Sequence, residues 1–157
     1  MPHIDHETLL KLAHYDPGSG VFTRLSSGRE MGRPDRKGYL LSTLRGSSFR
    51  LHRLAWYYMK GVWPADEIDH INGRPGDNRW SNLRECSHQE NNHNQPLRRN
   101  NTSGVKGVYR NKNGKWHVQV CLNYKIHHGG FFDDLSEAER SAKELRARLH
   151  GEFANHG

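Results

Sequence analysis

Residues 67–94, EIDHINGRPGDNRWSNLRECSHQENNHN, combine an acid–histidine pair, an Asn-Gly dipeptide and six asparagines. Asparagine is a poor strand former and is mostly exposed, so this many in a short stretch indicate turns, ligands or both. EIDHI is typical of a short strand, and Asn-Gly at 72–73 of a turn followed by an irregular loop over 74–82. LRECS predicts a second strand and HQENNHN a short helix. The stretch therefore predicts a strand–loop–strand–helix element.

The whole chain is basic and poor in hydrophobic residues. Its 157 residues are 33% hydrophobic and its formal net charge is +7. With a mean hydropathy of −0.99, the chain favours small modules over one large core. The charge points to a polyanionic partner, nucleic acid first, and the simpler alternative is a basic protein with no such partner.

Charge is arranged in blocks along the sequence. Residues 36–65 contain six Lys or Arg and no acid, and residues 91–132 contain seven Lys or Arg and again no acid. Residues 66–90, between them, hold six acids against three Arg. A metal-using site flanked by phosphate-binding surfaces would produce this pattern, and chance clustering in a basic chain is the alternative.

Cysteine content and hydropathy narrow the class of protein. Cys86 and Cys121 are far apart and form no C-x-x-C motif, so neither a disulfide framework nor a Cys-rich zinc site is expected. The first residues lack the apolar run of a signal peptide, and no segment approaches the length of a membrane span. We therefore expect a cytoplasmic protein without a membrane partner.

The flanking segments predict further modules. A helix is expected over residues 5–14, then strands, then a helix starting near Leu51. After residue 105, strands around an Asn-Gly turn at 113–114 and a third strand, KIHHGGFF, precede an amphipathic helix. Ser136 and Glu139 predict a capping box for that helix. Its inner stripe is expected to be Ala138, Ala142, Leu145 and Leu149.

The acid–histidine pair suits phosphodiester hydrolysis, which needs an activated water and relief of negative charge on the phosphate. A histidine accepts a proton at neutral pH, and oxygen ligands can hold a divalent cation. His70 could thus address the water while Asp69 faces a metal, with Asn91 as a second oxygen ligand. Asn82 could hydrogen-bond the backbone and hold the His70 strand in place. Alternatively, the pair is an ordinary surface feature and the asparagines only form turns.

The run D-H-x-N-G, then D-N-R-x-x-N-L-R, then E-N-N-x-N resembles the HNH endonucleases of the ββα-metal superfamily, especially phage and intron-encoded homing enzymes. The three family positions fall at His70, Asn82 and Asn91, with spacings of 12 and 9 residues. The resemblance implies that His70 is the general base and Asn82 the orienting asparagine. It also implies that Asp69 and Asn91 bind one Mg²⁺ or Mn²⁺ ion, with waters and phosphate oxygens completing the shell because Asn91 replaces the more common histidine. No structural zinc is expected.

The segment SGVKGVYRNKNGKWHVQV, with GGFFDDLSEAERSAKE after it, resembles the three-stranded DNA-binding domain of plant ethylene-response transcription factors. That domain also occurs behind phage HNH nucleases, and the resemblance implies a sheet laid into the major groove of double-stranded DNA. Long basic side chains would hold phosphates, while Arg110 or Gln119 could read a base edge. The alternative is that these are ordinary solvent-facing residues. The candidate contacts are Arg98, Arg99, Arg110, Lys112, Lys115, His117 and Gln119.

Together these features predict an α+β chain with three parts. Residues 1–96 would form a small β-rich region and an HNH module, with the motif at 67–94. A linker over 97–105 would lead to the sheet-and-helix module at 106–157. The expected function is a metal-dependent, phage-encoded, homing-like DNA endonuclease, either monomer or homodimer. The alternatives are a sequence-specific DNA-binding regulator with an inactive nuclease motif, and an enzyme that acts on RNA.

Overall fold

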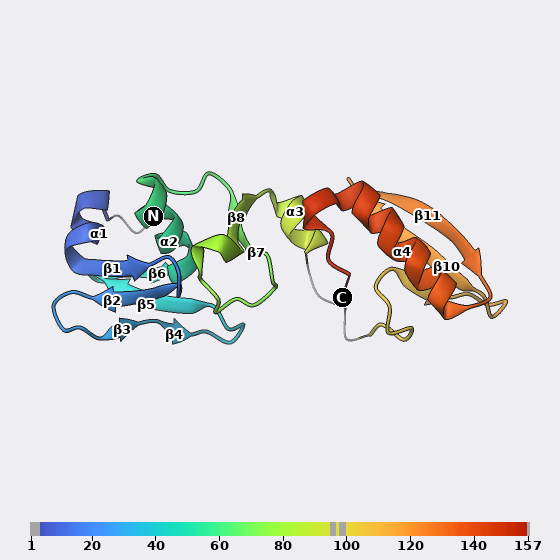
Figure 1. Cartoon of the computed structure of the whole chain (residues 1–157), viewed down its shortest axis with the longest axis horizontal. Coiled ribbons are helices and arrows are strands. Elements are labelled where there is room, and N and C mark those ends of the chain that lie inside the picture. Colours follow the sequence, from blue (N-terminus) through green and yellow to red (C-terminus); the bar gives the residue numbers. More distant parts are fainter. Residues whose placement is uncertain (1–3, 95–96, 98–99, 157) are drawn as a thin grey trace. The chain divides into compact units, whose positions relative to one another are not determined.

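In the computed structural model, which describes residues 4–94, 97 and 100–156, helices and strands mix in an α+β fold, as predicted (Figure 1). Contacts along the chain group Met1–Ser87 as one unit and His88–Gly157 as the other. The sequence places the division later, at the expected linker 97–105. The difference is helix α3 (His88–His93) and the residues after it. Asn94 belongs with the second unit because its oxygens accept hydrogen bonds from Asn155 Nδ2, at 2.7 and 3.1 Å.

The first unit begins with a short helix and two small antiparallel sheets, with strand orders β1-β2-β3 and β4-β5-β6. The first helix ends at Leu12 rather than at residue 14, because His14 and Tyr15 already alternate between solvent and core as a strand does. The elements are α1 (His6–Leu12), β1 (Ala13–Asp16), β2 (Val21–Arg24), β3 (Glu30–Met31), β4 (Arg33–Pro34), β5 (Leu40–Leu44) and β6 (Ser47–Arg50).

Helix α2 (Leu51–Lys60) supplies much of the core of the first unit and starts where the sequence predicts. Leu51, Leu54 and Ala55 lie on one face and are buried. The helix ends at Gly61, whose φ of 72° is a left-handed conformation that glycine adopts without strain. Around α2 the core collects buried side chains from both sheets and from α1, namely Leu9, Ala13, Tyr15, Phe22, Leu44 and Phe49.

The strand–loop–strand element follows α2 and attaches to the same core. Strands β7 (Glu67–His70) and β8 (Leu83–Cys86) pair antiparallel, with Ile68 and Leu83 packed into the core. The loop between them closes in the 3-10 turn η1 (Trp80–Asn82). Asn72-Gly73 forms the expected turn, because Gly73 has a φ of 67° and its N–H donates to His70 O at 2.8 Å. The loop therefore starts and ends at fixed points on a two-stranded sheet.

The second unit is a three-stranded antiparallel sheet covered on one face by a long helix (Figure 1). Val118 and Val120 of the central strand pack against Ala138, Ala142 and Leu145 of the helix, and the stripe predicted for that helix is confirmed. The elements are β9 (Val108–Arg110), β10 (Trp116–Leu122), β11 (Lys125–Phe132), α4 (Leu135–His150) and η2 (Gly151–Phe153), in the sheet order β11-β10-β9.

The predicted capping box of α4 is wrong. Asp134, not Ser136, is the N-cap, and its carboxylate accepts hydrogen bonds from the backbone N–H groups of Ser136 and Glu137. An aspartate satisfies these end donors and also interacts favourably with the positive end of the helix. The helix therefore starts at Leu135, whose side chain packs against the core.

In the described part of the chain, no helix is both long enough and apolar enough to span a membrane.

Candidate functional site

Asp69 lies directly opposite Arg84 in the β7–β8 register. Its Oδ2 atom accepts hydrogen bonds from Nε and Nη2 of Arg84 at 2.9 and 2.8 Å. The Asp69 side chain is 5% exposed and that of Arg84 15%, so this is a largely buried ion pair. Because the pair is largely buried, each charge would be costly without the other. The two hydrogen bonds from Arg84 also hold the Asp69 carboxylate in one orientation.

His70 is the last residue of β7 and is 4% exposed. Its ring lies edge-to-face against His52 with centroids 5.1 Å apart, and it also approaches the ring of Tyr39 at 5.9 Å. Burial lowers the pKa of His70, and the hydrogen bond with Asn78 and the charge of Asp69 oppose that shift. The imidazole is therefore neutral at pH 7, the form that accepts a proton.

Asn82 closes the loop onto the end of β7. Its Oδ1 accepts a hydrogen bond from the N–H of Asn72 at 3.0 Å, and its Nδ2 donates to the main-chain oxygen of Asp77 at 2.7 Å. The side chain is buried. The backbone bonds expected of Asn82 are thus present, and they tie the loop that follows His70 to the start of β8. A part of Asn82 in catalysis stays a prediction.

Asn91, the fourth residue expected at the site, lies in α3 and is half-buried. This helix belongs to the second unit, whereas Asp69, His70 and Asn82 belong to the first. The structure therefore brings three of the four residues together within one unit. The expected metal ligation by Asn91 stays a prediction.

The donor chemistry of the site is that of hard oxygen ligands. In the described ranges of the chain, no group of three or more His, Cys, Asp or Glu is placed to hold a metal ion. The carboxylate of Asp69 and the carboxamide of Asn91 are oxygen donors, which suit a cation that keeps several water ligands, as Mg²⁺ does. The residues at these positions therefore fit Mg²⁺ or Mn²⁺ better than Zn²⁺.

Two residues at the site were missed or left undecided by the sequence. Asn78 received no role, yet it is 1% exposed and its Oδ1 lies 3.1 Å from Nε2 of His70. Its position in a Gly- and Asp-rich loop gives it the appearance of a turn former, so no local signal identifies it. Arg84, the arginine of the N-L-R run, could by residue type either touch phosphate or support the motif, and its ion pair with Asp69 shows the supporting contact.

His52 is a packed residue of the core. It is buried against Tyr39 and His70, and burial lowers the pKa of His52 to about 3. Its Nδ1 atom has no hydrogen-bond partner among the residues that the structure describes. The neutral His52 ring therefore packs against one side of the His70 ring.

The open face of the second unit carries the expected DNA contacts of β10. Because Val118 and Val120 point to the helix, Lys115, His117 and Gln119 point to the other face of the sheet. His117 stacks on Phe131 with ring centroids 4.3 Å apart, and its Nε2 lies 2.9 Å from Nδ1 of His128. This face is therefore both polar and aromatic.

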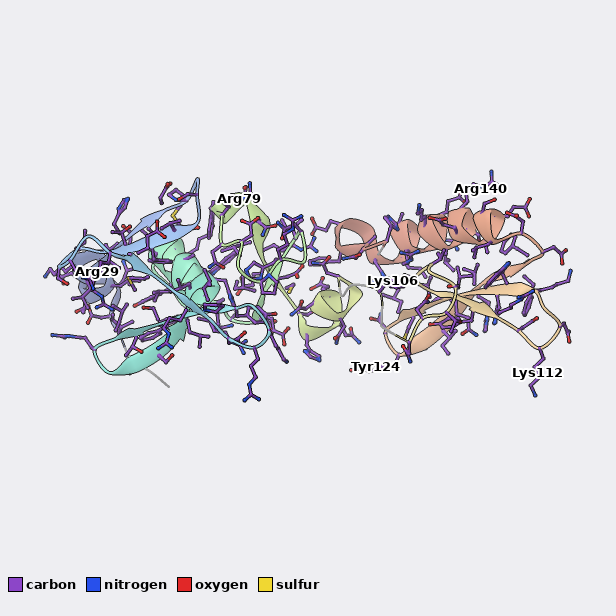
Figure 2. All side chains as sticks on the ribbon, turned by 90° about the horizontal axis from the view of Figure 1, so that it is seen from below. Arg29, Arg79, Lys106, Lys112, Tyr124 and Arg140 are labelled. Atoms are coloured by element: carbon purple, nitrogen blue, oxygen red, sulfur yellow. The ribbon has the colours of Figure 1, made fainter. Side chains whose placement is uncertain are left out.

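The remaining basic candidates have different surroundings. The guanidinium of Arg110 lies 5.4 Å from the Trp116 ring centroid, and its Nε donates to Gly114 O at 3.2 Å. Lys112 extends from the β9–β10 turn away from the sheet (Figure 2). Arg98 and Arg99 lie outside the described residues. Their contacts, like those of the rest, stay predictions.

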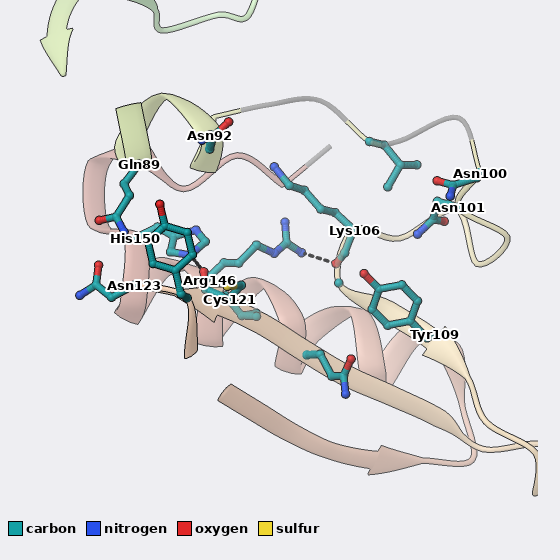
Figure 3. A pocket seen from close by; sticks show the side chains of 15 residues that line it. Gln89, Asn92, Asn100, Asn101, Lys106, Tyr109, Cys121, Asn123, Arg146 and His150 are labelled. Atoms are coloured by element: carbon teal, nitrogen blue, oxygen red, sulfur yellow. Dashed lines mark hydrogen bonds between the residues drawn. The ribbon is translucent and has the colours of Figure 1, made fainter. Parts of the chain in front are cut away.

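A pocket of about 550 Å³ lies in the second unit, between the sheet and the end of α4 (Figure 3). Arg146 is fully buried and reaches from α4 to donate to the main-chain oxygen of Lys106 at 3.1 Å. Burial, together with the charge of Arg146, lowers the pKa of Lys106 to about 8. Among the described residues that line the pocket, none is Asp or Glu. The described lining of the pocket is therefore polar and partly basic.

Comparisons with known proteins agree with this geometry. A sequence model described as HNH endonuclease matches residues 49–93, which run from α2 through the site to α3. The strand–loop–strand element with its Asp-His pair is thus an HNH endonuclease domain. Protein 3.8 of Escherichia phage T7 is 35% identical over 107 residues, covering 67% of this chain and 88% of that protein. Residues 49–93 therefore belong to the HNH endonuclease family, and the chain is a relative of Protein 3.8.

A solved structure is also similar. The HNH homing endonuclease I-HmuI, studied for DNA binding and cleavage, aligns with a TM-score of 0.48 and 23% identity. The alignment covers 60% of this chain and 57% of that one, so this chain spans little more than half of that enzyme. The HNH resemblance seen in the sequence is confirmed, whereas the resemblance of the second unit to ethylene-response factors stays a prediction.

Proposed function

We propose that this chain is a metal-dependent DNA endonuclease that hydrolyses phosphodiester bonds, with His70 as the general base. The observation that carries the proposal is the buried imidazole of His70, the residue directly after Asp69 at the end of β7, inside the HNH segment 49–93. A neutral imidazole takes the proton from water as its oxygen attacks phosphorus. The products are a 5′-phosphate and a 3′-hydroxyl.

The divalent cation is held by Asp69 and Asn91 in this proposal. When bound, a Mg²⁺ or Mn²⁺ ion stabilises negative charge on the phosphate and on the leaving oxygen. Arg84 keeps the Asp69 carboxylate oriented through two N–H groups. Asn82 holds the loop after His70 in position through its hydrogen bonds to Asn72 and to the Asp77 backbone.

Double-stranded DNA is the proposed substrate, and the second unit is proposed to bind it. Support comes from the open face of β10, from Lys112 at its turn and from the pocket, whose described lining residues include Lys106 and no acid. The long basic side chains would contact phosphates, as in other DNA-binding modules. A three-stranded sheet covered by a helix on the opposite face leaves this face available for the duplex.

The biological setting belongs to the proposal as well. Because Protein 3.8 is from Escherichia phage T7, we infer a phage-encoded, homing-like enzyme that works in the cytoplasm of a bacterial host. One HNH site hydrolyses one strand at a time, so a monomer nicks DNA. Cleavage of both strands requires a homodimer or two binding events.

A plasmid assay tests the proposed function. Supercoiled plasmid should be converted to nicked circles in Mg²⁺ or Mn²⁺, because the cation is needed for the charge that develops on phosphate. EDTA should abolish nicking, and added Mg²⁺ should restore it. Binding without nicking in either metal would instead indicate the regulator with an inactive motif. A parallel incubation with an RNA of the same sequence shows whether RNA is the substrate.

The DNA-binding proposal predicts the effect of Lys112→Ala. The variant should bind DNA more weakly, and the slope of log K against log salt should fall by about 1, because one phosphate contact is lost. Fluorescence anisotropy over a salt series measures both. Arg140→Ala is the matched control, because Arg140 is an exposed cation on α4, away from the sheet turn (Figure 2). Equal slopes for Lys112→Ala and the unchanged protein would show that Lys112 touches no phosphate.

A further inference from the structure

Asn78 contacts the imidazole of His70 from the loop between β7 and η1. Its Oδ1 lies 3.1 Å from Nε2 of His70, and both side chains are buried. A carboxamide oxygen accepts hydrogen bonds and cannot donate them, so Nε2 must carry the ring hydrogen. A neutral imidazole has one N–H, and the lone pair that takes a proton is then on Nδ1.

Asn78 is itself held by the hairpin of β1 and β2. The hydroxyl of Tyr15, a fully buried side chain of β1, donates to the main-chain oxygen of Asn78 at 2.7 Å. The β1–β2 turn packs closely on the same peptide: a Cβ at Gly20 would lie 2.4 Å from the carbonyl carbon of Asn78. Trp80 N–H also donates to Pro17 O at 3.0 Å. The loop backbone at Asn78 is therefore fixed from outside the HNH element.

We propose that Asn78 is a positioning residue that sets the tautomer of His70, and that Tyr15 holds Asn78 in place for this purpose. This inference rests on the proposed nuclease function for its consequence in catalysis. With hydrogen on Nε2, the Nδ1 lone pair takes the proton of the attacking water. The O–H electron pair stays on the water oxygen, which forms the new bond to phosphorus. The bond to the 3′-oxygen breaks, its electron pair leaves with that oxygen, and the oxygen takes a proton from solvent to become the 3′-hydroxyl.

The opposite orientation of the Asn78 carboxamide has a distinct consequence. If Nδ2 faced the ring, it would donate to Nε2, and the ring hydrogen would sit on Nδ1. In the orientation found here, Nδ2 is buried and has no hydrogen-bond partner within the described part of the chain. The two orientations thus predict opposite tautomers, which can be told apart directly.

Nitrogen-15 NMR of the histidine rings in the full chain provides the test, at about pH 8 where the ring is neutral. The signals of His70 are identified by their loss in a His70→Gln variant. The unchanged protein should show His70 with hydrogen on Nε2. Asn78→Ala should give a mixture of tautomers, whereas Asn78→Asp should keep the Nε2–H form, because a carboxylate oxygen also accepts this hydrogen bond.

Tyr15→Phe is the second variant, since it keeps the buried ring and removes only the hydroxyl. It should give a smaller admixture of the other tautomer than Asn78→Ala. Tyr124→Phe, at an 88% exposed tyrosine of the second unit, is the matched control and should leave the His70 tautomer unchanged. In cleavage assays, Asn78→Ala should lower kcat by about 10-fold or more, as part of what a general base contributes, with KM and DNA affinity unchanged. Asn78→Asp should restore a large part of kcat.

The outcomes separate this inference from the proposed function. An Nδ1–H tautomer in the unchanged protein, or a tautomer unaffected by Asn78→Ala, overturns the inference even if the protein nicks DNA. The protein could also show an Nε2–H tautomer that depends on Asn78 and yet not nick DNA. That result would support the positioning contact and contradict the proposed nuclease function. A loss of kcat in Asn78→Ala that Asn78→Asp does not restore, with the tautomer unchanged, indicates a merely structural residue and counts against the inference.

Discussion

We expect the His70→Ala variant to cleave DNA about 10²–10⁴-fold more slowly while binding it nearly as tightly as the unchanged protein. The general base acts only in the chemical step, so kcat and kcat/KM should fall together. The ring is buried and not part of the open basic face of the second unit, so its loss removes no phosphate contact. Single-turnover cleavage in Mg²⁺ and anisotropy with the same duplex measure the two quantities separately.

Two further variants make the result specific to the imidazole. Removing a buried ring leaves a cavity beside His52 and Tyr39, which destabilises the fold. His70→Gln keeps more of the volume and should lose cleavage to a similar extent with a higher Tm than His70→Ala. His14→Ala removes an exposed histidine of β1 and should retain full activity. If His70→Ala cleaved DNA at the rate of the unchanged protein, His70 would not be the general base.

The Asp69→Ala variant is expected to lose both cleavage and stability. Cleavage should fall by about 100-fold or more, because the charged ligand proposed for the cation is gone. The free energy of unfolding should fall by about 3 kcal/mol, because the largely buried guanidinium of Arg84 loses its carboxylate partner. Nicking over a Mg²⁺ series and chemical denaturation measure the two effects. By comparison, Glu7→Ala breaks the exposed pair of α1 and should cost less than about 1 kcal/mol.

A double variant separates the two effects of Asp69. Replacing both members of the pair, as Asp69→Ala with Arg84→Met, removes the buried charge together with its partner and should recover most of the stability. Cleavage should remain absent, because methionine supplies no oxygen ligand. Recovery of nicking in the double variant would mean that Asp69 acts only through the fold and binds no cation.

Local patterns in the sequence were sufficient for much of the fold. The alternation of Val118 and Val120 with Gln119 identified the two faces of β10, and helical spacing identified Ala138, Ala142 and Leu145 as the buried stripe of α4. Both periodicities follow from the geometry of a single element, so they need no knowledge of its neighbours. The start of α4 was misplaced because Asp134 and Ser136 are both good N-caps by type.

For the candidate site as well, the sequence predicted the family but not the contacts between side chains. An Asp-His pair at the end of an expected strand, with asparagines at fixed spacings, was enough to point to the HNH family, which the comparisons confirm. The contacts that those residues make could not be predicted from the sequence. Arg84 meets Asp69 only because β7 and β8 pair in one register, and Asn78 meets His70 only because the loop folds back over the strand end.

Properties of short stretches of the chain, such as periodicity, charge blocks and motif spacing, could therefore be determined from the sequence alone. The contact of the His70 ring was not, because its Nε2 meets the carboxamide oxygen of Asn78 in a loop that Tyr15, 63 positions before Asn78, holds in place. Hydrogen bonds and ion pairs of this kind need their two groups to lie within about 3 Å of each other. Only tertiary packing brings these groups together, so the pattern of neighbouring residues does not predict the contact.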